Sequence, residues 1–129
     1  MNLQPAEPAR EPVAVLGAGS WGTALAIQFA RAGHPTRLWG RDTAHIATLA
    51  AARRNERYLG DAEFPDSLSV TDSLTTALHD AQDVVIAVPS HALRKLLDEI
   101  APRLAPSVRL AWATKGFEPG SGRFLHEVA

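Results

Sequence analysis

The fold of this chain is decided by Val13-Ala-Val-Leu-Gly17-Ala-Gly19-Ser-Trp-Gly22-Thr-Ala-Leu-Ala-Ile27. Four apolar residues run into three glycines at Gly-x-Gly-x-x-Gly spacing, and an apolar helical pattern follows without a gap. This strand–turn–helix context gives the short motif a physical meaning. Gly17 permits a tight turn, Gly19 leaves room for a pyrophosphate beside the backbone, and Gly22 lets the helix pack closely on the strand. The free N–H groups at the helix start attract the anion; the alternative is a turn that serves packing alone.

Length and composition restrict the class of protein. The 129 residues suit one domain, and a hydrophobic content of 46% is typical of a folded chain. A net charge of −1 favours neither a nucleic-acid partner nor a membrane surface, and no apolar run approaches the ~20 residues of a membrane span. The absence of cysteine excludes disulfides and thiol chemistry, and it fits a cytoplasmic location. The five histidines show no metal-ligand spacing, so we expect no metal site.

The two ends of the sequence are expected to differ from its middle. Residues 1–12 hold prolines and mixed charges without an apolar run, which favours a disordered tail over a secretory signal. Residues 121–129 resemble the start of an amphipathic helix that has no stop signal. We therefore expect residues 13–129 to form one dinucleotide-binding domain, truncated within or just after a helix.

Strand patterns alternate with helix patterns along the chain. This alternation predicts an α/β fold, a Rossmann-like doubly wound and mostly parallel sheet with helices on both faces. A polar loop is expected over residues 55–66. The inward faces of the first two helices are expected to carry Leu25, Phe29 and Ala32, and Ile46, Leu49 and Ala50. The expected strands are 13–16, 36–39, 68–70, 83–88 and 108–113, and the expected helices are 20–32, 43–54, 71–80 and 91–100.

Four segments follow directly on predicted strands and are expected to meet at one edge of the sheet. Ligands of open parallel sheets bind outside the carboxyl ends of the strands. This convergence is a stronger indication of a binding site than any single motif. The four segments are 17–22, 40–42, 88–90 and 114–116.

Arg41 is the candidate for recognising the adenosine end of a dinucleotide. It follows the second strand, where its guanidinium can pair with the 2′-phosphate of NADP; the alternative is a solvated surface charge. Asp42 lies about 20 residues after Gly22, the spacing of an NAD-type ribose acid, but it also suits the cap of the next helix. We expect NADP or NAD as cofactor, with NADPH favoured.

The remaining candidates surround the turn and the other strand ends. The N–H groups of Ser20 and Trp21 are expected to face the phosphates, and the Trp21 ring either packs the helix start or forms part of the nicotinamide wall. Ser90 either contacts the nicotinamide ribose or caps its helix, where His91 is the one histidine expected near this edge. Lys115 would face an anionic substrate or the nicotinamide, unless it is an ordinary surface lysine.

Taken together, these segments resemble bacterial NAD(P)-dependent glycerol-3-phosphate dehydrogenase. The resemblance covers residues 13–129, although Gly60 replaces a proline that the family usually has after Tyr-Leu. The matching motifs are Gly17-Ala-Gly-Ser-Trp-Gly-Thr-Ala-Leu-Ala26, Leu38-Trp-Gly-Arg-Asp42, Asn55-x-x-Tyr58-Leu59, Val88-Pro-Ser90 and Ala113-Thr-Lys-Gly116.

The resemblance implies a two-domain enzyme that interconverts dihydroxyacetone phosphate and sn-glycerol 3-phosphate by hydride transfer, for glycerophospholipid synthesis. It implies that Ser20, Trp21 and Arg41 contact the cofactor and that Lys115 contacts both cofactor and substrate. It places the principal catalytic lysine beyond Ala129, in a helical C-terminal domain that also offers a surface for a homodimer. We therefore expect these residues alone to bind dinucleotide weakly and not to turn over substrate.

Two other functions share these sequence features. One is a related NAD(P)-dependent reductase of a small keto acid, because the fold alone does not fix the substrate. The other is a dinucleotide-sensing module without chemistry, a reading that Lys115 at a strand end disfavours.

Overall fold

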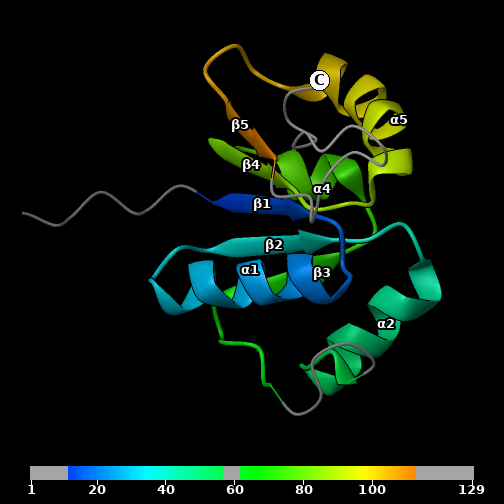
Figure 1. Ribbon diagram of the computed structural model, residues 1–129. Helices are drawn as coiled ribbons and strands as arrows, with labels where there is room; N and C mark the ends of the chain where they lie inside the picture. The colour runs from blue at the N-terminus through cyan, green and yellow to red at the C-terminus, as the bar shows by residue number, and fades with distance from the viewer. Residues whose placement is uncertain (1–11, 57–61, 113–129) are drawn as a thin grey trace, which may run out of the picture.

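The computed structural model describes residues 12–56 and 62–112, and these form an α/β domain built on a parallel sheet (Figure 1). Strands and helices alternate as expected from the sequence. The elements are β1 (Val13–Leu16), α1 (Ser20–Arg31), β2 (Thr36–Trp39), α2 (Thr43–Ala52), β3 (Leu68–Thr71), α4 (Leu74–Leu78), β4 (Asp83–Ile86), α5 (Ser90–Ile100), the 3₁₀ turn η1 (Ala101–Arg103) and β5 (Arg109–Trp112).

The strands lie in the order β3-β2-β1-β4-β5, and every neighbouring pair is parallel. From β1 the chain first adds β2 and β3 on one side of the sheet, and it then crosses to the other side to add β4 and β5. The direction in which strands are added therefore reverses between β1 and β4. This reversal is the topological switch point at which doubly wound sheets bind ligands. The predicted Rossmann-like fold is confirmed for the described residues.

Helices cover both faces of the sheet, as Figure 1 shows with α1 on one side and α4 and α5 on the other. Each face has its own apolar core. Val13 and Val15 of β1 belong to the α1 side, whereas Ala14 and Leu16 belong to the α5 side. Successive residues of a strand point to opposite faces, so burial on both explains why β1 is an unbroken apolar run.

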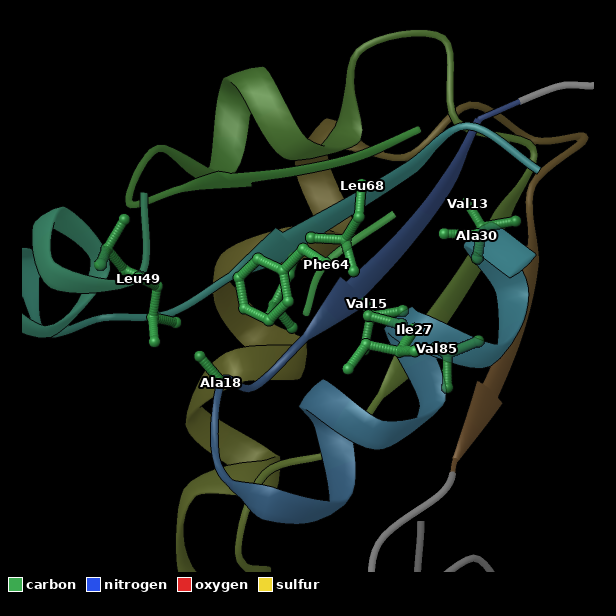
Figure 2. Close-up of a cluster of buried hydrophobic side chains, with 12 residues drawn as sticks. Val13, Val15, Ala18, Ile27, Ala30, Leu49, Phe64, Leu68 and Val85 are labelled. Atoms are coloured by element: carbon green, nitrogen blue, oxygen red, sulfur yellow. The ribbon is translucent and has the colours of Figure 1, made fainter. Parts of the chain in front are cut away.

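The core on the α1 side joins three layers of the fold (Figure 2). Ile27 of α1 lies beside Val15 of the central strand, and Ala30 lies beside Val13 of the same strand. Phe64 and Leu49 extend this cluster past the end of the sheet toward α2.

Helix α1 is rotated relative to the expected orientation. Ala26, Ile27 and Ala30 are buried; Leu25 and Phe29 are only partly buried, and Ala32 is exposed beyond the helix end. The expected inward face was therefore wrong by about one position. Gly22 packs directly against the turn, so the helix face that contains Gly22 faces the sheet. Ala26 and Ala30 continue this face and are buried with it.

Helix α2 ends two residues earlier than expected, because Arg53 adopts a left-handed conformation with φ 54°. Arg53 then donates hydrogen bonds to the carbonyl oxygens of Leu68 (2.7 Å) and Pro65 (2.8 Å). Ile46 and Leu49 are buried as predicted, but Ala50 is exposed.

The segment after α2 is not a purely polar loop, and this expectation was wrong for its described residues. Phe64 is 6% exposed within the core, and Asn55 is fully buried. The tail expected at 1–12 lies outside the described residues except for Pro12, and so does Tyr58. Within the part that the structure describes, no helix is long and apolar enough to cross a membrane.

The fit between the first turn of α1 and the glycine turn leads to a stability prediction. A Cβ on Gly22 would lie 1.8 Å from the carbonyl oxygen of Gly17, whereas a Cβ on Gly19 would meet no atom within 4 Å. We expect Gly22→Ala to lower the free energy of unfolding by about 3 kcal/mol through overpacking. Gly19→Ala should change it by only about 0.5 kcal/mol, the cost of alanine at a helix cap. Urea unfolding of both variants checks this, and equal losses would contradict it.

Candidate functional site

A cleft of about 660 Å³ lies at the carboxyl ends of β1, β2 and β4. This volume falls within the range of small-molecule sites, roughly 300–1,000 Å³. Three of the four segments predicted to converge do line it, namely the glycine turn, the end of β2 and the start of α5. The fourth, residues 114–116, lies outside the described residues, although β5 leads toward the same edge.

The glycine turn is fixed between the two strands that flank β1. The Gly17 N–H donates to the carbonyl oxygen of Trp39 at 2.8 Å, and the Ala87 N–H donates to that of Leu16 at 2.8 Å. Gly17 has φ 129°, and a Cβ there would lie 2.4 Å from the Ala87 oxygen. Only glycine can make this turn, because both its conformation and its surroundings exclude a side chain.

Gly19 has a different environment, because it borders the open side of the turn. A Cβ there would meet nothing within 4 Å, so the missing side chain leaves space in the cleft instead of close packing. The N–H groups of Gly19 and Ser20 have no hydrogen-bond acceptor among the residues that the structure describes. Unpaired N–H groups at a helix start beside empty space suit the pyrophosphate of a dinucleotide.

Two tryptophans border this cleft in different ways. Trp21 follows Ser20 in the first turn of α1, and it is 42% exposed, unlike the other large apolar side chains of the described ranges. Trp39 at the end of β2 is 4% exposed, and its buried Nε1 has no hydrogen-bond partner in the described part of the chain. The cleft therefore has aromatic surface on both sides of the glycine turn.

Arg41 lies at the predicted adenosine end of the cleft. Its side chain is 57% exposed, and its guanidinium carbon lies 5.3 Å from the centre of the Trp39 ring. Its Nη2 donates to Glu99 Oε1 at 2.8 Å. Asp42, the alternative reader of a ribose, accepts from the His45 N–H at 3.2 Å and caps α2.

Ser90 lines the cleft with Val88 and Pro89, as expected, but it does not cap α5. It is the first residue of the helix, and the cap position is occupied by Pro89, whose carbonyl accepts from the Ala92 N–H at 2.9 Å. The prediction of Ser90 as a cap was therefore wrong. Its hydroxyl makes no capping hydrogen bond and is exposed at the edge of the cleft.

Two polar residues behind the glycine turn were missed as candidates. Asn55 Nδ2 donates to the Ala18 carbonyl oxygen at 3.2 Å, and His45 Nε2 contacts the same oxygen at 3.2 Å. His91 was expected to be the one histidine near this edge of the sheet, and this expectation was wrong because His45 also lies there. Asn55 belonged to a recognised motif, but no local pattern indicates that its side chain contacts a carbonyl 37 residues earlier in the chain.

Comparison with known proteins agrees with this geometry. The family model described as the N-terminus of NAD-dependent glycerol-3-phosphate dehydrogenase matches residues 12–129. A glycerol-3-phosphate dehydrogenase (NAD(P)+) of Xanthomonas euvesicatoria is 56% identical over 117 residues, covering 91% of this chain and 34% of that protein. One of Idiomarina loihiensis is also 56% identical, over 91% of this chain and 35% of that protein. The chain thus spans about a third of the length of the curated relatives that it matches.

Solved structures show the same likeness. Glycerol-3-phosphate dehydrogenase from Coxiella burnetii superimposes with a TM-score of 0.83 at 42% identity, covering 94% of this chain and 37% of that one. The yeast enzyme superimposes with a TM-score of 0.76 at 23% identity, over 95% of this chain and 38% of that one, and shows the fold alone. The match of the family model to nearly the whole chain shows that it belongs to the family of NAD-dependent glycerol-3-phosphate dehydrogenase N-terminal domains.

Proposed function

We propose that this chain is the cofactor-binding part of a glycerol-3-phosphate dehydrogenase. The whole enzyme would interconvert dihydroxyacetone phosphate and sn-glycerol 3-phosphate with NAD(P)H, in the cytoplasm and for glycerophospholipid synthesis. The observation that carries this proposal is the glycine turn, whose unpaired N–H groups border open space at the switch point of the sheet. Membership of the family supplies the choice of substrate.

Different residues of the cleft are proposed to bind different parts of the cofactor. The N–H groups of Gly19, Ser20 and Trp21 hold the pyrophosphate at the helix start, where anions are stabilised. Gly17 and Gly22 shape the turn that presents these groups. When bound, NAD(P)H supplies the hydride for the carbonyl carbon of the substrate. Ser90 lies on the side of the turn opposite β2, where it contacts the nicotinamide ribose.

Arg41 is proposed to select NADPH by binding its 2′-phosphate. In the described structure the guanidinium is already engaged by Glu99, so the two anions compete for it. An exposed ion pair contributes roughly 0–1 kcal/mol, because water screens it. A phosphate carries about −1.5 to −2 charge and three acceptor oxygens, against the single charge of the Glu99 carboxylate, so the phosphate is favoured in this competition. The guanidinium carbon of Arg41 also lies 5.3 Å from the centre of the Trp39 ring, a contact that does not depend on which anion Arg41 binds.

Lys115 is proposed to contact both cofactor and substrate. It follows the last residue of β5 by three positions in the sequence, and β5 runs parallel to β4, whose carboxyl end borders the cleft. A lysine there provides a point charge for the substrate phosphate and holds the substrate beside the cofactor. Because this chain spans about a third of the length of its curated relatives, we propose that the principal catalytic lysine lies beyond Ala129, in a helical domain that is also proposed to form a homodimer.

The two alternative functions are less well supported. A reductase of small keto acids fits the fold but not the family whose model matches the chain. A sensing module fits the cleft, but relatives that are 56% identical to this chain over 117 residues are named as dehydrogenases.

The cofactor preference is tested by Arg41→Ala in the whole enzyme. We expect the KM for NADPH to rise about tenfold and that for NADH to change less than about twofold, because only NADPH offers a 2′-phosphate. Arg94→Ala removes an equal charge from the exposed face of α5 and should leave both constants unchanged. Equal losses for both cofactors, or none, would show that Arg41 does not read the 2′-phosphate.

Lys115 is tested by Lys115→Ala in the whole enzyme, measured with dihydroxyacetone phosphate and NADPH. We expect kcat/KM to fall about a hundredfold, the scale of losing a positioned charge or proton donor. Lys95→Ala, on the exposed face of α5, is the matched control and should retain full activity. Unchanged activity of Lys115→Ala would overturn the substrate assignment.

Residues 1–129 by themselves are expected not to catalyse the reaction. Hydride transfer needs cofactor, carbonyl carbon and proton donor held together, and this chain supplies the cofactor bed and one lysine of that set. The oxidation of NADPH on addition of dihydroxyacetone phosphate, followed at 340 nm by absorbance, is the measurement. Turnover by the isolated chain would contradict the division of labour proposed above.

A further inference from the structure

The Ala18 carbonyl is held from behind the glycine turn by two side chains. Asn55 Nδ2 lies 3.2 Å from the Ala18 oxygen, and His45 Nε2 also lies 3.2 Å from it. A carbonyl oxygen can only accept, so Nε2 carries the proton in this contact. Both donors come from residues far along the chain, which places α2 and the segment after it directly against the turn.

Two other carbonyls of the turn, those of Leu16 and Gly19, are satisfied by the backbone. The Leu16 oxygen accepts from the Ala87 N–H, and the Gly19 oxygen accepts from the Thr23 N–H at 3.0 Å. No backbone N–H within the described ranges donates to the Ala18 oxygen. The orientation of the Ala18 carbonyl therefore depends on side chains, unlike that of the Leu16 and Gly19 carbonyls.

Anchoring this carbonyl also determines where the next N–H group points. The Ala18 C=O and the Gly19 N–H belong to one planar trans peptide, so they point in opposite directions. With the oxygen held toward Asn55 and His45, the N–H is aimed away from them, into the open side of the turn. That side is the cleft in which the pyrophosphate is proposed to lie.

The chemistry of Asn55 itself favours a positioning role over a stabilising one. The side chain is fully buried, and its Nδ2 also donates to the hydroxyl of the buried Thr23 at 2.9 Å. Its Oδ1 is buried without a hydrogen-bond partner in the described part of the chain. An unsatisfied buried acceptor is costly, whereas both hydrogen bonds of Nδ2 serve other groups, the Ala18 carbonyl and the Thr23 hydroxyl. The presence of asparagine here is therefore explained by the groups that its Nδ2 holds in place.

We infer that Asn55, assisted by His45, is the positioning residue that aims the Gly19 N–H at the cofactor pyrophosphate. This inference rests on the proposed function, because it presumes that a dinucleotide occupies the cleft. Asn55 does not touch the cofactor. It acts through the peptide between Ala18 and Gly19, and it therefore affects ligands that carry a pyrophosphate and spares those that do not.

The test compares two ligands in the whole enzyme. Both 2′-phospho-ADP-ribose and 2′-AMP carry the phosphate proposed for Arg41, but only the first has a pyrophosphate. We expect Asn55→Leu to weaken 2′-phospho-ADP-ribose about tenfold, the value of one hydrogen bond to a charged group, and to weaken 2′-AMP less than about twofold. The KM for NADPH should rise by the same factor of about ten, while kcat at saturating NADPH changes less than about threefold.

Two further variants separate positioning from a general loss of stability. Thr36→Val removes another buried hydrogen-bonding side chain, at the end of β2 that is away from the cleft. The Thr36 hydroxyl donates to the carbonyl oxygen of His34 at 2.8 Å. This substitution should lower the melting temperature and leave the affinities for both ligands unchanged. His45→Phe removes the second donor to Ala18 from a partly exposed position, and it should weaken only the pyrophosphate ligand, about threefold.

The outcomes distinguish a failure of the proposed function from a failure of the positioning role of Asn55. If the wild-type enzyme binds neither NADPH nor NADH, the proposed function is wrong. If it binds NADPH and Asn55→Leu weakens both ligands equally or neither, the positioning role is wrong. If Asn55→Leu does not fold, His45→Phe decides, and an unchanged ratio of the two affinities in that variant overturns the inference.

Discussion

The close contact between Gly22 and the Gly17 carbonyl is the constraint on which the rest of this structure depends. A Cβ at Gly22 would lie 1.8 Å from that oxygen, so α1 can begin directly above the end of β1 only because no side chain intervenes. The same contact fixes the rotation of α1 and turns its small residues toward the sheet. It also leaves the first N–H groups of the helix at the cleft, where they are available to an anion. Packing and binding thus follow from one short stretch of backbone.

The order of strands converts this local geometry into a site. Because β1 lies between β2 and β4, the segments that leave those strands flank the glycine turn on both sides. On the β2 side they bring Trp39 and Arg41, which suit an adenosine and its 2′-phosphate. On the β4 side they bring Val88 and Ser90, which line the other part of the cleft. Behind the turn, Asn55 and His45 hold the backbone itself.

The sequence predicted the architecture well because its signals were local. Apolar runs such as Val13–Leu16 and the glycine spacing determine strand, turn and fold class without reference to distant residues. The inward face of α1 was misjudged because a contact with the turn, and not the largest apolar side chains, determines the rotation of the helix. Asn55 and the ion pair of Arg41 with Glu99 were missed because both join segments far apart in sequence. Only the folded chain reveals such pairings. The alternative that Ser90 caps its helix was wrong because Pro89 occupies the cap position.

The central claim is that a dinucleotide places its pyrophosphate on the open side of the glycine turn. It is tested most directly by titrating the ¹⁵N-labelled chain with NADPH and following its amide signals by nuclear magnetic resonance, which detects weak binding. The account predicts saturable shifts that are largest at Gly19 and Ser20 and negligible at Thr36, on the opposite edge of the sheet. Shifts that are absent at millimolar NADPH, or that centre on the hollow between α4 and η1 lined by His79 and Arg103, would contradict it.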